Sequence, residues 1–129
     1  MIYTSYYGAL KKLPKDVAPV SISLYAPAWW KGVEYKKLAP KPHDFSVYKE
    51  TGDVRQFVEA YEANTLRGLS RREVIDEIRA LIGPEYRDFA LVCFEGPGKF
   101  CHRYIVSTWL CNGGFICSEY SVNEGEGAK

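Results

Sequence analysis

Hydrophobic and polar positions along this chain form short apolar runs that alternate with helix-like stretches. Runs rich in β-branched and aromatic residues predict strands at residues 2–7 and 20–24. Two later runs, residues 89–95 and 115–120, also predict strands. The near-continuous apolar character of residues 89–95 is typical of a strand covered on both faces, as in parallel sheets.

Three other segments place apolar residues at the 3.6-residue spacing of a helix. The first is residues 53–66, and the second opens at Ser70, whose spacing to Glu73 matches a capping box. The third runs from about Cys101 to Asn112 and is followed by two glycines, a strong helix-ending signal. We therefore expect three helices between the first pair of strands and the last strand.

The order of these elements predicts a single α/β domain over residues 1–122. We expect three layers, a short and mainly parallel sheet, and a C-terminal β-loop-α-β unit, which is right-handed in nearly all proteins. Residues 26–45 carry three prolines and no sustained period, so they predict a long irregular connection. The polar tail, residues 123–129, is expected to be disordered.

Composition and charge limit the kinds of function that this sequence predicts. The net charge of +1 supplies no global field toward nucleic acid or membranes, so any anion must be recognised locally. No signal peptide or membrane-spanning run is present in the sequence, which predicts a cytoplasmic protein. In that compartment the four cysteines are expected to be reduced thiols.

The cysteine spacing predicts no metal site and no cofactor. Cys93, Cys101 and His102, Cys111 and Cys117 contain no CxxC pair and match no zinc pattern. Cys93, Cys111 and Cys117 are interpreted as small core residues.

Cations at the start of the third helix predict a site for an anion. Lys99, His102 and Arg103 lie where a helix dipole is already positive, so they need compensation. A phosphate or carboxylate held by the first-turn amides, Lys99 and Arg103 would supply it, with Glu95 orienting a polar group of the ligand. An internal ion pair between Glu95 and Arg103 is the alternative.

Cys101 is the candidate nucleophile of a second hypothesis. A thiol at a helix N-terminus beside cations can have a lowered pKa, and His102 or Glu95 would then handle protons. A small residue that only caps the helix is the alternative explanation for Cys101.

Aromatic side chains near the same sheet edge are candidates for stacking on a ring of the ligand. Trp29 and Trp30 are adjacent in a coil, so one can be core and the other exposed, and Tyr6 ends the first strand. Structural packing is the alternative role for all three.

The combination CFE and CHR, residues 93–95 and 101–103, resembles the signature of the uncharacterised-domain family numbered 488, a family of small bacterial and phage proteins. The opening IYTSYY and the stretch from Trp30 to Pro40 resemble a short subgroup of that family. The resemblance implies an α/β fold and makes Glu95, Cys101 and the two residues after it the ones of interest.

Three functions remain open at this point. The first is binding of a phosphate-bearing, nucleotide-like small molecule or a nucleic-acid end at residues 95–103. The second is an enzyme that uses Cys101 as a thiolate nucleophile. The third is an interaction module without a ligand, which would carry a large exposed apolar patch.

Overall fold

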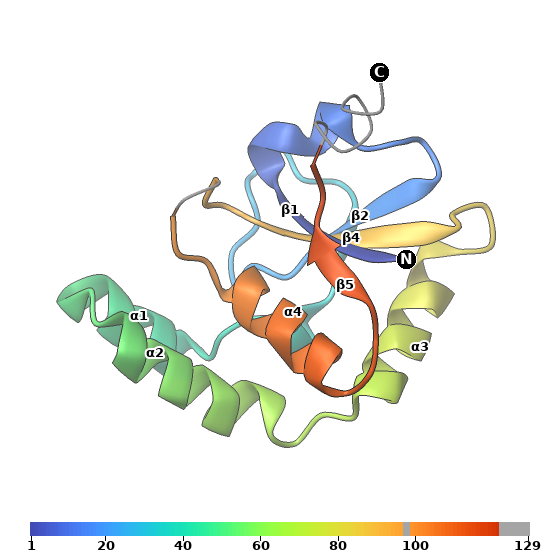
Figure 1. Ribbon diagram of the computed structural model, residues 1–129. Helices are drawn as coiled ribbons and strands as arrows, with labels where there is room; N and C mark the ends of the chain where they lie inside the picture. The colour runs from blue at the N-terminus through green and yellow to red at the C-terminus, as the bar shows by residue number, and fades with distance from the viewer. Residues whose placement is uncertain (97–98, 122–129) are drawn as a thin grey trace.

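A computed structural model of the chain describes residues 1–96 and 99–121 (Figure 1). Among the described residues the sheet has five strands in the order β3-β2-β4-β1-β5, and all four pairings between neighbouring strands are parallel. The strands are β1 (Ile2–Tyr6), β2 (Val17–Ser21), β3 (Val33–Glu34), β4 (Asp88–Cys93) and β5 (Cys117–Glu119). The α-helices are α1 (Pro42–Thr51), α2 (Val54–Tyr61), α3 (Arg71–Ile82) and α4 (His102–Asn112). The predicted α/β class and parallel sheet are confirmed.

The three layers follow from the alternation of side chains along β4, which is buried at every position. Phe89 and Leu91 point to the face covered by the α-helices and belong to the main core. Ala90 and Val92 point to the opposite face, where Tyr7 opens the short 3₁₀ helix η1 (Tyr7–Lys12). The layer on that second face is thin, because it consists of η1 and neighbouring loop rather than α-helices (Figure 1).

The second strand begins earlier than predicted, at Val17, and includes Pro19. Ile22 donates its amide toward β4, and Ser21 accepts an amide from the β3 side, so alternate residues of β2 face opposite neighbours. Pro19 therefore faces the β3 side, where pairing starts only opposite Val20. Its missing N–H costs the sheet no hydrogen bond, so proline is tolerated there.

The predicted irregular connection, residues 26–45, contains more structure than expected. It holds β3, the 3₁₀ helix η2 (Lys36–Leu38) and the first turn of α1. Pro42 occupies one of the first two positions of α1, where a proline costs no helical hydrogen bond. The prolines therefore separate short elements instead of preventing them.

The three predicted helices are confirmed. Asp53 caps α2, which continues as a π-helical segment, η3 (Glu62–Leu66), and Ser70 caps α3 by accepting the Glu73 amide. The predicted tail, residues 123–129, lies outside the described residues. Within the described part of the chain, no helix combines the length and apolar character that crossing a bilayer requires.

Candidate functional site

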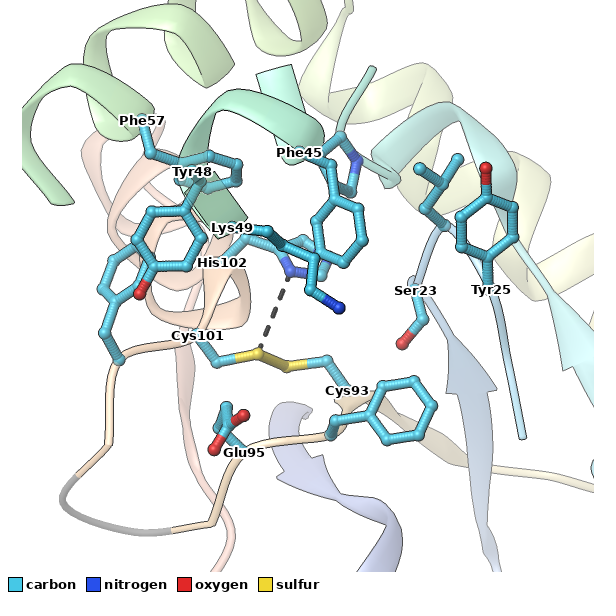
Figure 2. Close-up of a pocket in the computed structure, with 14 residues that line it drawn as sticks. Ser23, Tyr25, Phe45, Tyr48, Lys49, Phe57, Cys93, Glu95, Cys101 and His102 are labelled. Atoms are coloured by element: carbon cyan, nitrogen blue, oxygen red, sulfur yellow. Dashed lines mark hydrogen bonds between the residues drawn. A yellow bond between two sulfur atoms is a disulfide. The ribbon is translucent and has the colours of Figure 1, made fainter. Parts of the chain in front are cut away.

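A pocket of about 450 Å³ opens beyond the carboxyl ends of β2 and β4 (Figure 2). The chain leaves β2 toward β3 at one side of the sheet, and it leaves β4 through α4 toward β5 at the other side. This divergence is the switch point at which open α/β sheets bind ligands. The lining residues are Ser23, Leu24, Tyr25, Pro40, Phe45, Tyr48, Lys49, Phe57, Cys93, Phe94, Glu95, Phe100, Cys101 and His102.

Aromatic rings from α1, α2 and the loop before α4 form one wall of the pocket. The ring of Tyr48 lies 5.0 Å from that of Phe57 and 5.7 Å from that of Phe100, measured between centroids. Lys49 is exposed, and its ammonium lies 5.3 Å from the ring centroid of Phe45. The wall is therefore apolar with a cation at its rim.

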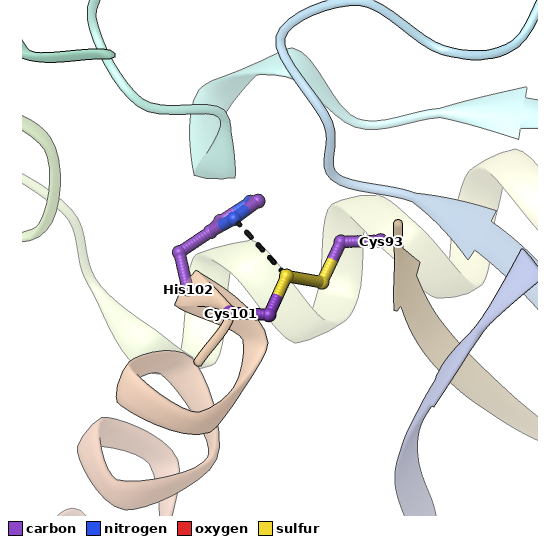
Figure 3. Close-up of side chains that lie close together, drawn as sticks. All are labelled: Cys93, Cys101 and His102. Carbon is purple, nitrogen blue, oxygen red and sulfur yellow. Dashed lines mark hydrogen bonds between the residues drawn. A yellow bond between two sulfur atoms is a disulfide. The ribbon is translucent and has the colours of Figure 1, made fainter. Parts of the chain in front are cut away.

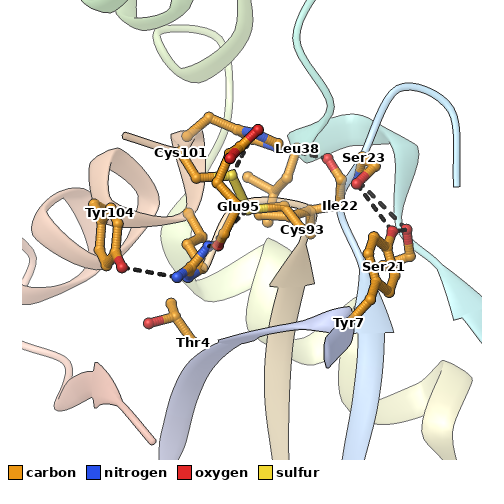
Figure 4. Close-up of a disulfide and its surroundings, with 12 residues drawn as sticks. Thr4, Tyr7, Ser21, Ile22, Ser23, Leu38, Cys93, Glu95, Cys101 and Tyr104 are labelled. Carbon is orange, nitrogen blue, oxygen red and sulfur yellow. Dashed lines mark hydrogen bonds between the residues drawn. A yellow bond between two sulfur atoms is a disulfide. The ribbon is translucent and has the colours of Figure 1, made fainter. Parts of the chain in front are cut away.

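The floor of the pocket carries a disulfide between Cys93 and Cys101 (Figure 4). The expectation of four reduced thiols is wrong for this pair, because the loop after β4 folds back and brings the start of α4 against the strand end. Cys117 is buried as expected, whereas Cys111 is exposed on α4 and is not a core residue.

His102 presents an unprotonated ring nitrogen to the Cys101 sulfur. Its Nε2 lies 2.7 Å from the carbonyl oxygen of Ile22, which only accepts, so Nε2 carries the proton. Nδ1 is then left with its lone pair, 3.9 Å from Sγ of Cys101 (Figure 3). Burial lowers the pKa of His102 to about 4, so the imidazole is neutral at pH 7. The ring of Tyr61 packs edge-on against it.

Arg103 is fully buried, and its guanidinium makes five hydrogen bonds to the protein. Nε and Nη2 bond the two carboxylate oxygens of Glu119 at 3.0 and 2.9 Å. The remaining donors reach Sγ of Cys93, the backbone oxygen of Glu95 and the hydroxyl of Tyr104. The predicted ion pair with the Glu95 carboxylate is therefore replaced by one with Glu119. Glu119 also supplies the charge compensation that the start of α4 requires.

Three of the predicted site residues line the pocket: Glu95, Cys101 and His102. Arg103 lies just behind it, and the exposed Lys99 is not among the described lining residues. That these residues act on a ligand stays a prediction.

The predicted stacking aromatics lie elsewhere. Tyr6 places its ring over the Arg103 guanidinium, at 5.6 Å from its centroid. Trp29 is 59% exposed and Trp30 is half-buried, and both rings contact Tyr7. None of these three rings is among the described residues that line the pocket.

The residues at the rim of the pocket and the partner of Arg103 were not predicted from the sequence. Tyr25, Tyr48 and Lys49 belong to a segment without helical periodicity, and no sequence signal placed them over β4. Glu119 ends β5, but pairing it with Arg103 required knowing that β5 lies beside β1, whose Thr4 also donates to Glu119.

Comparison with known proteins bears on the family alone. No curated protein and no solved structure matches the chain. A family model described as "Active DUF488-N3 subclade" matches residues 6–114, which include most of the strands and all four α-helices. The CFE and CHR residues that line or support the pocket fall within this match. The chain therefore belongs to the DUF488 family, within this subclade.

Proposed function

We propose that the pocket binds a phosphate-bearing, nucleotide-like small molecule. The observation that carries the proposal is the aromatic-walled pocket of about 450 Å³ at the switch point of the sheet. Ligand sites are commonly apolar clefts of roughly 300–1,000 Å³ with a few convergent polar groups, and this pocket fits that description.

The polar groups at the pocket match the parts of such a ligand. A flat ring would lie between Tyr25, which is 65% exposed, and the aromatic wall around Tyr48. The phosphate would lie near the Lys49 ammonium and the N-terminal turn of α4, which adds partial positive charge. The exposed Glu95 is placed to accept from a polar group of the ligand.

Arg103 has a supporting role in this proposal. All of its donors serve protein acceptors, so it acts by holding Glu95 and Cys93 in place at the pocket floor. This differs from the direct phosphate contact expected from sequence. Lys49 takes over the role of the cation that meets the ligand.

Two exposed aromatic residues provide the matched test. We expect nucleoside mono- and diphosphates, screened by isothermal titration calorimetry, to yield at least one binder of the wild-type protein. Tyr25→Ala should weaken that binding about tenfold, because stacking contributes roughly 1–3 kcal/mol per base. Trp29→Ala removes a similarly exposed ring outside the pocket and should leave affinity unchanged. Equal losses in both variants, or no binder in the whole panel, would overturn the proposal.

The placement of His102 favours a second candidate function, a thiol enzyme. Once the disulfide is reduced, Nδ1 can accept from the Cys101 thiol, while Ile22 fixes the ring. The sulfur would then attack an electrophilic centre, and the leaving group would depart with the bonding electrons. Nδ1 or Glu95 would take the thiol proton and deliver it to the leaving group.

Iodoacetamide labelling of the reduced protein tests this candidate with an internal reference. Peptide mass spectrometry separates Cys101 from Cys111, which is exposed on the same helix. Labelling of Cys101 with an apparent pKa below about 7 supports a nucleophile. A pKa near 8.5, like that of an ordinary thiol, counts against it.

A further inference from the structure

Three side chains that bind soft metal ions converge at the pocket floor. Sγ of Cys93, Sγ of Cys101 and a ring nitrogen of His102 all lie within 4.8 Å of one another (Figure 3). All three residues are buried, yet all three belong to the pocket lining. The cluster is therefore buried and borders the pocket.

The orientation of His102 suits a metal ligand. Zinc-bound histidines usually donate their second ring nitrogen to a carbonyl or carboxylate, which fixes the tautomer. Here Nε2 donates to the Ile22 carbonyl at 2.7 Å, so Nδ1 keeps its lone pair and faces the two sulfurs. The hydrogen-bond acceptor that would orient His102 as a metal ligand, the Ile22 carbonyl, is therefore already in place.

Arg103 suits the same site because it favours thiolate over thiol. Its Nη1 donates to Sγ of Cys93 at 3.3 Å, a contact that stabilises negative charge on sulfur. The guanidinium charge is itself balanced by Glu119. Two thiolates and one divalent cation then add no net charge to this buried region.

We propose that Cys93 and Cys101, once reduced, bind Zn²⁺ together with Nδ1 of His102. A dithiol reductant supplies two electrons and two protons to the disulfide and becomes a disulfide itself. Zn²⁺ then replaces the two thiol protons, which leave to solvent. Three protein ligands leave one coordination position toward the pocket, the arrangement of catalytic rather than structural zinc sites.

No zinc signature is visible in the sequence because the proposed ligands lie on either side of a loop. Cys93 ends β4, whereas Cys101 lies eight residues later as the N-cap of α4, which begins at His102. The fold, not a CxxC spacing, brings them together. Zinc would bind at the floor of the pocket, whereas the proposed nucleotide contacts concern its walls and rim.

Wild-type protein in two redox states provides the first test. Both redox forms are stripped with a chelator, loaded with Zn²⁺ and dialysed. The reduced protein should retain one Zn²⁺ per chain, whereas the oxidised protein should retain none. Co²⁺ should give the visible absorption of a tetrahedral thiolate complex only with the reduced form. Zn²⁺ should also protect Cys93 and Cys101 from alkylation while Cys111 remains reactive. Retention of equal metal by both redox forms, or alkylation that Zn²⁺ does not slow, would overturn the proposal.

Matched variants assign the ligands. Cys93→Ser and Cys101→Ser should each weaken Zn²⁺ binding by more than about 100-fold, since even outer partners are worth 10–100-fold. Cys111→Ser and His43→Gln are the controls, and His102→Gln should behave like the cysteine variants. If either serine variant fails to fold, the alkylation result on wild-type protein decides. Unchanged affinity in a folded Cys93→Ser or Cys101→Ser variant would contradict the site.

Discussion

Arg103 shows how one residue holds several parts of the site together. Its guanidinium joins the end of β4, the following loop and β5, although its own Cα lies in α4. Such a fully buried cation depends on Glu119, whose side chain is 30% exposed. Removal of the carboxylate would leave a buried charge without its counter-ion.

Glu119→Ala should therefore lower the free energy of unfolding by about 3 kcal/mol, at the lower end of losses for broken buried pairs because Glu119 is partly exposed. Urea denaturation measures the loss. Glu34→Ala, which removes an exposed partner of Lys36, is the matched control and should cost less than about 1 kcal/mol. Similar losses in both variants would mean that the Arg103 pair contributes no more than a surface pair.

His102 gives the stability a defined pH dependence. In the folded chain burial lowers its pKa to about 4, whereas in the unfolded chain the value returns to about 6.5. Below pH 6.5 the His102 imidazole takes up a proton in the unfolded chain but stays neutral in the folded chain. The stabilisation is therefore complete above about pH 6.5 and is lost as the pH falls toward 4.

Metal-free wild-type protein should lose about 3 kcal/mol between about pH 7 and 4 through this residue. His102→Gln should lack that part of the pH dependence, and His43→Gln, which changes an exposed histidine, should retain it. Urea denaturation at a series of pH values separates the three proteins. Parallel pH profiles for wild type and His102→Gln would contradict the assignment.

At the scale of elements, the hairpin formed by α1 and α2 covers the pocket. The turn between the two helices depends on Gly52, which has a φ of +68° and nothing within 4 Å of an added Cβ. Gly52→Ala should cost about 1 kcal/mol from backbone conformation alone. Gly68→Ala is the control, since it has equal space and no positive φ. Thermal denaturation should show a lower Tm for Gly52→Ala only.

The helices also show why α2 and α3 were predicted from the sequence and α1 was not. α2 and α3 place buried residues at helical spacing and carry capping side chains, so their sequences were sufficient. In α1 the single buried residue is Asp44, which accepts from the Asn64 amide at 3.0 Å. A helix fixed by a tertiary polar contact leaves no apolar period in its sequence.

At the scale of the whole molecule, the position of the pocket agrees with the topology predicted from the sequence. A buried strand at residues 89–95 and a helix from Cys101 place the intervening loop at the carboxyl edge of a parallel sheet. The strand order was not predictable, because no local pattern specifies which strands pair. For that reason Glu119 and the covering residues of α1 appeared only in the folded structure.

The Cys93–Cys101 disulfide links the folding of the whole chain to its redox state. The bond closes a loop with a sequence separation of 8, and in the chain-entropy description a closed loop of that length stabilises a protein by about 2 to 3 kcal/mol. Addition of a dithiol under metal-free conditions should lower the unfolding free energy by that amount.

Excess Zn²⁺ should then restore stability to the reduced protein, because an ion that binds only the folded chain shifts the equilibrium toward it. A Cys93→Ser/Cys101→Ser double variant should respond to neither reagent. A wild-type protein whose denaturation curve is unaffected by reduction would show that the disulfide adds nothing to stability, and recovery by Zn²⁺ in the double variant would place the metal elsewhere.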